Sequence, residues 1–126
     1  MNTEIKLTEE LTEEEISLYE DKAVDLAKQH NVSKVYPVVQ IDPITFERKV
    51  CYIKEPNYPT KLSVMDKALT VGVYHAADEL REISVIKDAS DSITYGESSE
   101  CDKYKLGVVD FCLGIITRLQ NQFKKK

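Results

Sequence analysis

The spacing of hydrophobic and polar residues first predicts a helix near the start of the chain. Residues 12–15, Thr-Glu-Glu-Glu, have the form of a capping box, in which the Thr12 hydroxyl and the Glu15 carboxylate each accept the other residue's backbone amide. Apolar residues then recur at the spacing of one helical face, at Ile16, Tyr19, Ala23, Leu26 and Ala27. We therefore predict a helix that ends at the His30-Asn31 pair. Residues 1–10 are expected to fray or to form a short strand.

Two extended segments follow this helix. Residues 35–41 (VYPVVQI) and 49–54 (KVCYIK) are rich in β-branched and aromatic side chains, and a turn-rich connector separates them, which predicts an antiparallel hairpin. Pro37 cannot donate to a ladder, so the first strand is expected at a sheet edge, or else Pro37 lies at its irregular start. Both faces of the second strand are apolar, which predicts a cover of helices or of a partner on each face. We expect Val50 and Tyr52 to face the core, with Cys51 and Ile53 on the other face.

A proline-rich joint ends the second strand. Pro56 and Pro59 prevent its continuation, and Thr60 is placed to cap a following helix. Helical spacing then continues to Ile83, with Gly72 as the point where this segment can divide into two helices. Residues 84–88 (SVIKD) are a candidate third strand before a polar loop.

The last helix is predicted to open near Ser99, and it is apolar on nearly all sides. Only Asp110 and Arg118 are charged between Leu106 and Leu119. One apolar stripe contains Val108, Phe111, Cys112, Ile115, Leu119 and Phe123. Such a helix is either central in its own domain or shared with another chain. If one stripe suffices for the core, the second is left for a partner, which predicts a partner-binding site at Leu106, Val109, Leu113 and Ile116.

These elements predict an α+β fold, in which a β-hairpin or small antiparallel sheet packs against three to four helices and the long C-terminal helix is central. We expect the 126 residues to form one domain over 1–126, with a flexible start at 1–10. A chain of this size buries roughly two-thirds of its unfolded surface.

Composition narrows the classes of partner. The net charge is −5, with nine acidic and three basic residues in the first 31, and the chain has no tryptophan. This acidity argues against a nucleic-acid partner. No apolar run reaches the about 20 residues of a membrane span, and the acidic start lacks the order of a secretory signal. We expect no membrane partner and a cytoplasmic protein.

No arrangement of residues indicates catalysis, a cofactor or a metal. The cysteines, Cys51, Cys101 and Cys112, have unrelated spacings and are expected to be reduced core residues. His75 and Glu79 lie one helical turn apart. This spacing favours a surface ion pair over an acid–base pair or one half of a metal site. There is no glycine-rich phosphate loop. An enzyme is the weaker hypothesis, and we expect no catalytic residue, no cofactor and no metal.

The order of these segments resembles that of small tail-assembly-chaperone-like proteins of bacteriophages. The resemblance covers residues 34–119: a strand that reads "KVCYIKEP", a joint and helix that read "NYPTKLSVMDKAL", and a closing helix that reads "YKLGVVDFCLGIITRL". The chain lacks the glycine-rich, aromatic stretch often found before the final segment, since "DASDSITYGESSE" holds one glycine. The resemblance implies a non-enzymatic protein that holds another phage protein, or itself, during assembly, and for a phage-encoded chain it implies the cytoplasm of the host cell.

The expected function is therefore protein–protein binding or self-association in a homo-oligomer, in the form of an assembly chaperone for a tail or virion component. Two alternatives remain open at this point. One is a structural subunit or connector of the virion, and the other is a small cytoplasmic regulatory module.

Overall fold

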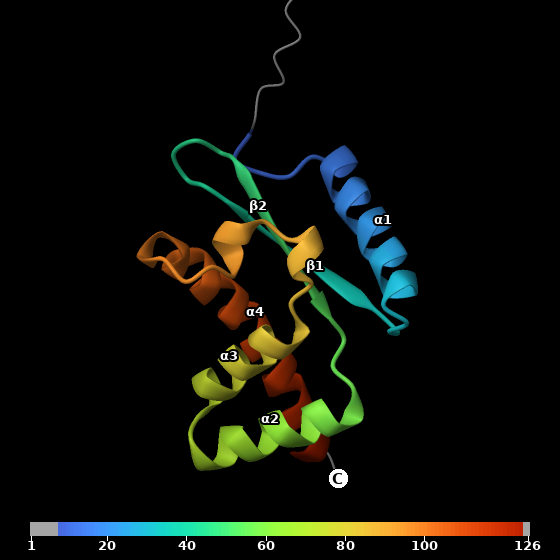
Figure 1. Ribbon diagram of the computed structural model, residues 1–126, viewed down its shortest axis with the longest axis vertical. Helices are drawn as coiled ribbons and strands as arrows, with labels where there is room; N and C mark the ends of the chain where they lie inside the picture. The colour runs from blue at the N-terminus through green and yellow to red at the C-terminus, as the bar shows by residue number, and fades with distance from the viewer. Residues whose placement is uncertain (1–7, 125–126) are drawn as a thin grey trace, which may run out of the picture.

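The computed structural model describes residues 8–124, and side chains through residue 121. Within that range the chain has an α+β fold with four α-helices and one two-stranded antiparallel sheet, as the sequence predicted (Figure 1). Three short 3-10 turns, at Lys87–Ala89, Ser92–Thr94 and Ser99–Cys101, lead into the long last helix. The elements are α1 (Glu13–Gln29), β1 (Val35–Ile41), β2 (Arg48–Lys54), α2 (Tyr58–Thr70), α3 (Val73–Ser84) and α4 (Asp102–Lys124).

Helix α1 begins and ends where the sequence predicted. The Thr12 hydroxyl accepts the Glu15 amide at 3.1 Å, and the Glu15 carboxylate accepts the Thr12 amide at 3.0 Å, which completes the capping box. His30 is the C-cap, and Asn31 follows with a φ of 54°. Asn is one of the few residues that adopt this left-handed conformation readily.

The hairpin separates two apolar clusters. In Figure 1, α1 lies on one side of the hairpin and α3 and α4 lie on the other. On one face, Ala23 and Leu26 of α1 pack with Val35 and Tyr52 of the sheet. On the other face, Cys51 and Ile53 join the larger core with residues of α2, α3 and α4. Helices thus cover both faces of β2, as predicted. Val50 and Tyr52 were predicted to face the core, but the main core lies on the opposite face of β2, with Cys51 and Ile53. Tyr52 is buried and Val50 half-buried in the smaller cluster, so the prediction holds only there.

The cap of α2 is Asn57, which corrects the prediction of Thr60. The Asn57 side-chain oxygen accepts the Thr60 amide at 3.0 Å, so Thr60 is the third helical residue and Pro59 lies in the first turn. Both residue types are good caps, and the proline decides between them because it is favoured just inside a helix start. Gly72 divides α2 from α3, as expected, with a φ of 147° that residues with a Cβ rarely adopt.

The segment 84–88 forms a single bridge, between Val85 and Ile53, and then turns into a 3-10 helix. The predicted third strand is therefore absent from residues 84–88. The 85–91 segment nevertheless hydrogen-bonds along β2, where Ile86 donates its amide to the Tyr52 carbonyl at 2.9 Å and Asp91 donates its amide to the Val50 carbonyl at 2.9 Å. An irregular segment, and not a strand, thus hydrogen-bonds with the backbone groups at this edge of β2.

Helix α4 approaches the hairpin closely at Gly107. A Cβ on Gly107 would overlap the side-chain amide of Gln40, which donates to the Tyr104 carbonyl at 2.9 Å. Gly114, one heptad later, is exposed and has open space around it. Close packing therefore requires a glycine at position 107, whereas no contact requires one at position 114.

This difference gives a first prediction. Gly114→Ala is expected to raise the free energy of unfolding by about 1 kcal/mol, because alanine is the better helix former. Gly107→Ala is expected to lower it by about 1 kcal/mol, because Gln40 must move and lose its hydrogen bond. Urea denaturation measures both, and Gln40→Ala is the control background. If Gly107→Ala is equally destabilising in that background, the contact with Gln40 is not the cause.

Candidate functional site

The structure does not bring the four predicted partner-binding residues to one exposed surface. Leu106 is 65% exposed, and Leu113 is half-buried against the main core. Val109 is only 6% exposed and Ile116 is fully buried, both within that core. The premise that one stripe of α4 suffices for the core is therefore corrected: α4 packs on α3, α2 and the hairpin and uses parts of both stripes. Leu106 and Val109 do line a shallow hollow of about 400 Å³ with Tyr74 and His75.

The backbone groups of the sheet point to a different surface. Because Tyr52 and Val50 direct their amides and carbonyls toward residues 85–91, their antiparallel partners Pro37 and Val39 direct theirs away from β2. By the same alternation, the amide and carbonyl of Val35 also point outward. Among residues 8–124, no backbone group hydrogen-bonds to these outward-facing groups of β1. One edge of the sheet is covered, and the other is free of backbone hydrogen bonds, although Val35 on that edge is only 3% exposed.

A groove of about 840 Å³ lies beside this free edge, between α1 and Phe111 of α4. The α1 wall has small or apolar side chains, of which Val24 is 54% exposed, between the charged Glu20 and Lys28. The floor is the α1–β1 connection and the first half of β1. The lining residues from these parts are Glu20, Ala23, Val24, Ala27, Lys28, Asn31, Val32, Ser33, Lys34, Val35, Tyr36 and Pro37.

Aromatic and charged side chains form the α4 side of the groove. The rings of Tyr36 and Phe111 are tilted against each other with centroids 5.5 Å apart, and the Lys34 ammonium lies 4.9 Å from the Tyr36 ring centroid. The Tyr36 hydroxyl donates to Glu55 at 2.8 Å. Burial and this neighbouring carboxylate raise the pKa of Tyr36, so its hydroxyl stays protonated as a donor. These contacts hold the ring that forms this side of the groove.

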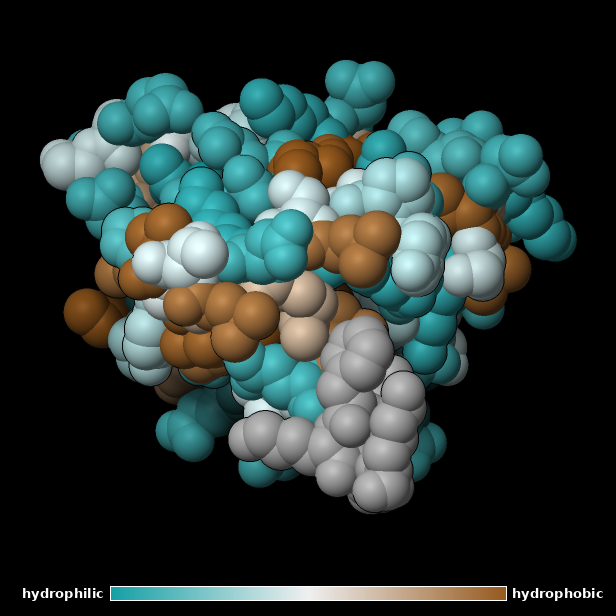
Figure 2. All heavy atoms as spheres, turned by 90° about the horizontal axis from the view of Figure 1, so that it is seen from below, coloured by the Kyte–Doolittle hydropathy of each residue, from teal (hydrophilic) through white to brown (hydrophobic). Residues whose placement is uncertain are grey.

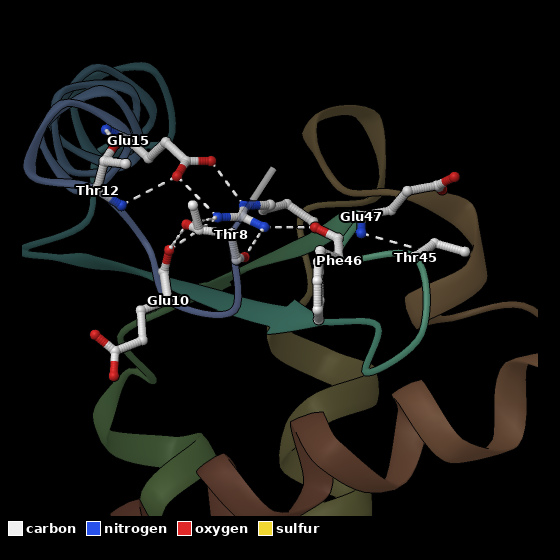
Figure 3. Close-up of polar contacts among 8 residues, drawn as sticks. Thr8, Glu10, Thr12, Glu15, Thr45, Phe46 and Glu47 are labelled. Carbon is white, nitrogen blue, oxygen red and sulfur yellow. Dashed lines mark hydrogen bonds and ion pairs between the residues drawn. The ribbon is translucent and has the colours of Figure 1, made fainter. Parts of the chain in front are cut away.

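Arg48 fixes α1 against the hairpin and so sets the position of the groove's α1 wall. Figure 3 shows the residues with which its side chain bonds, among them Thr8, Glu10 and Glu15. Its side chain is only 5% exposed, and its Nε donates to Glu15 Oε2 at 2.7 Å while its Nη2 donates to Glu15 Oε1 at 3.0 Å. The guanidinium also donates to the carbonyls of Thr8 at 2.7 Å, of Glu10 at 3.0 Å and of Phe46. One side chain therefore joins the chain before α1, α1 itself and the hairpin loop.

This contact changes the acidity of Glu15. The hydrogen bond from Arg48, and next the backbone hydrogen bond from Thr12, hold the pKa of Glu15 below its usual value of 4.5. Glu15 thus caps its own helix and binds Arg48 as a carboxylate. Residues 8–10, which were expected to belong to a flexible start, are held by Arg48, whereas residues 1–7 lie outside the described part of the chain.

The hairpin loop is fixed against α4 by a second carboxylate. Asp42 accepts the amides of Ile44 at 2.8 Å and Thr45 at 3.0 Å, and its other oxygen accepts the Tyr104 hydroxyl at 3.2 Å. These two amides, first that of Thr45 and then that of Ile44, lower the pKa of Asp42 to about 2. The loop closes with Phe46 at a φ of 62°. Asp42 is thus used in local structure.

The candidate residues for catalysis or metal binding, which are His75, Glu79 and the cysteines, do not line the groove. Glu79 pairs with Lys67 of α2 at 3.4 Å, and His75 is exposed, which corrects the expected His75–Glu79 ion pair. Burial raises the pKa of the Cys51 thiol, and it raises that of Cys112 to about 12, so neither favours the reactive thiolate. In the part of the chain that the structure describes, no three metal-ligating side chains gather as a metal site would need.

Comparison of the chain with protein-family models, curated proteins and solved structures gives no match. None of the helices within residues 8–124 combines the length and the apolar character of a membrane span.

Sequence reasoning missed the groove, although two signals for it were present. Pro37 indicated a strand with one free edge. Val24 is apolar but lies off the buried stripe of α1. The groove forms because the fold places α1 and Phe111 on either side of β1, and no local sequence pattern predicts that arrangement.

Proposed function

We propose that this chain is a protein-binding domain whose docking site is the groove between α1, the free edge of β1 and Phe111. The observation that carries the proposal is the coincidence of unpaired strand groups with an apolar hollow. Free strand edges are surfaces that proteins normally protect or use for pairing, and apolar hollows with a few polar groups are the usual binding sites.

The α2 end of the molecule is a weaker candidate surface. Leu62, Leu69 and Val71 are exposed there, and Figure 2, seen from that end, shows apolar side chains between hydrophilic ones. Scattered exposed apolar residues are normal on soluble proteins. They bring no unpaired backbone groups, so we favour the groove.

A role as an assembly chaperone for a phage tail or virion component is the narrower form of this proposal. Its support is the resemblance in the order of segments over residues 34–119. A structural virion subunit or a regulatory module would use the same kind of surface. The identity and fate of the bound protein separates these roles, because a chaperone is released when its client assembles, whereas a structural subunit stays in the particle.

A pair of charged substitutions on α1 tests the proposal. Val24→Lys places a solvated charge in the groove, and Leu18→Lys makes the same change on the same helix at a residue that is 69% exposed and does not line the groove. Both changes are expected to alter the free energy of unfolding by less than about 0.5 kcal/mol, because the sites are exposed. In affinity purification from the source cells, a specific partner should be retained by the wild type and Leu18→Lys and lost with Val24→Lys. Equal retention by all three proteins would contradict a docking site in the groove.

A further inference from the structure

One continuous face of α1 lines the groove. Its residues there are three or four positions apart, which is the spacing of one helical face, and they are Glu20, Ala23, Val24, Ala27 and Lys28. Glu20, Val24 and Lys28 are exposed, whereas the two alanines are small and more buried. Because the side chains at a contact set the distance between two helix axes, this face allows a second helix to approach α1 closely.

The charges on this face complement themselves. Glu20 and Lys28 lie four residues before and after Val24, which is about 6 Å in each direction along the helix. Neither side chain forms a salt bridge with another residue that the structure describes. The same asymmetry extends along the helix, which has three glutamates in its first turn and a lysine in its last.

This pattern selects the direction in which a copy of α1 can pair with α1. An antiparallel copy centred on Val24 places Glu20 opposite Lys28 of the second copy and Lys28 opposite Glu20 of the second copy. A parallel copy places like charges opposite each other at both positions, which opposes association. The antiparallel pair therefore has the two-fold symmetry of an isologous interface, in which every contact occurs twice.

The centre and the surroundings of this pair are apolar. Val24, which is 54% exposed, lies on the two-fold axis and meets Val24 of the second copy, so both side chains leave water. The start of β1 and Phe111 form the floor and the far wall of the groove in which α1 of the second copy lies. The groove thus combines an apolar centre with one acidic and one basic end.

From these observations we propose that the groove binds a second copy of this chain, as an antiparallel α1–α1 pair in which Glu20 of each copy bonds with Lys28 of the other. This inference rests on the proposed function and names the partner for the same site. The contact is short, and small interfaces associate weakly. We therefore expect a dimer that forms and dissociates with protein concentration.

Analytical ultracentrifugation of the full chain over a range of concentrations measures this dimer. Glu20→Lys and Lys28→Glu should each raise the dissociation constant about tenfold or more, because each places like charges opposite one another at both ends of the pair. Val24→Lys should have a similar effect, since it places two ammonium groups at the two-fold axis. All three sites are exposed, so circular dichroism should show an unchanged fold.

Exchanging the two charges is the sharper test. The double variant Glu20→Lys/Lys28→Glu should restore the dissociation constant to within about threefold of the wild type. An equimolar mixture of the two single variants should form a mixed dimer, because every contact then joins unlike charges. The matched control is Asp25→Lys, a charge reversal at an exposed residue of α1 that does not line the groove. It should change the dissociation constant by less than about twofold.

The outcomes separate this inference from the function on which it rests. A wild type that stays monomeric at about 1 mM, where even weak complexes form, would overturn the inference alone. The groove could then still bind a different protein, which the Val24→Lys purification decides. A wild-type dimer that is indifferent to the single reversals, or is not restored by the exchange, would show that the copies meet on another surface and would also overturn it.

Discussion

Replacing Ile116 by lysine is expected to unfold most of the protein. Ile116 is fully buried on α4 within the main core. An ammonium there has no partner, and the loss of an apolar side chain adds to the penalty, so we expect the free energy of unfolding to fall by about 4 kcal/mol or more. A domain of this size has about 5–15 kcal/mol in total. Far-UV circular dichroism and urea titration should show a much weaker or absent folding transition.

Leu106→Lys is the control on the same helix. Leu106 belongs to the same sequence stripe but is exposed, so this change should move the free energy of unfolding by less than about 0.5 kcal/mol. If Ile116→Lys instead folded with normal cooperativity, Ile116 would lie on a surface and the stripe would again be a candidate interface. The comparison thus separates core from surface on one helix.

Replacing Arg48 by alanine is the second large effect that we expect. At neutral pH the free energy of unfolding should fall by about 2–3 kcal/mol, because several charge-assisted hydrogen bonds are lost from a nearly buried side chain. The substitution also frees α1 from the hairpin loop. Urea denaturation measures the loss. Lys49→Ala, which removes the exposed pair with Glu47, should cost less than about 0.5 kcal/mol.

The effect of Arg48 should depend on pH in one direction. The pKa of Glu15 is lowered in the folded state, so its contribution is fully present above the unfolded value of about 4.5 and is lost as pH falls through the folded value. The difference in stability between the wild type and Arg48→Ala should therefore shrink below about pH 4. A difference that grows on acidification would show that Glu15 is not the important partner.

Local rules predicted those parts of the fold that depend on neighbouring residues. The capping box of α1, the antiparallel hairpin and the break at Gly72 were all confirmed. The edge position expected from Pro37 was also correct, because the missing amide is on the side of β1 that faces away from β2. In each case residues close in sequence contain the whole physical cause.

The parts that sequence could not predict depend on contacts between distant residues. The 84–88 segment has the side chains of a strand, but the bonds of Ser90 and Asp91 to β2 hold the chain that follows in an irregular path. Leu106 and Ile116 belong to one apolar stripe of α4. Only the packing of α3 and the hairpin decides that Ile116 is buried and Leu106 is exposed. The groove is of the same kind, since Phe111 meets Tyr36 across 75 residues of sequence.

The unequal edges of the sheet also limit stoichiometry. Residues 85–91 occupy the edge of β2, so a strand can join this sheet only along β1. If the added strand is β1 of a second copy, both open edges are used and the result is a closed dimer. Fibre formation needs two open edges on every subunit. The described sheet has one open edge, so a β-sheet that adds this domain along β1 cannot grow further on the β2 side.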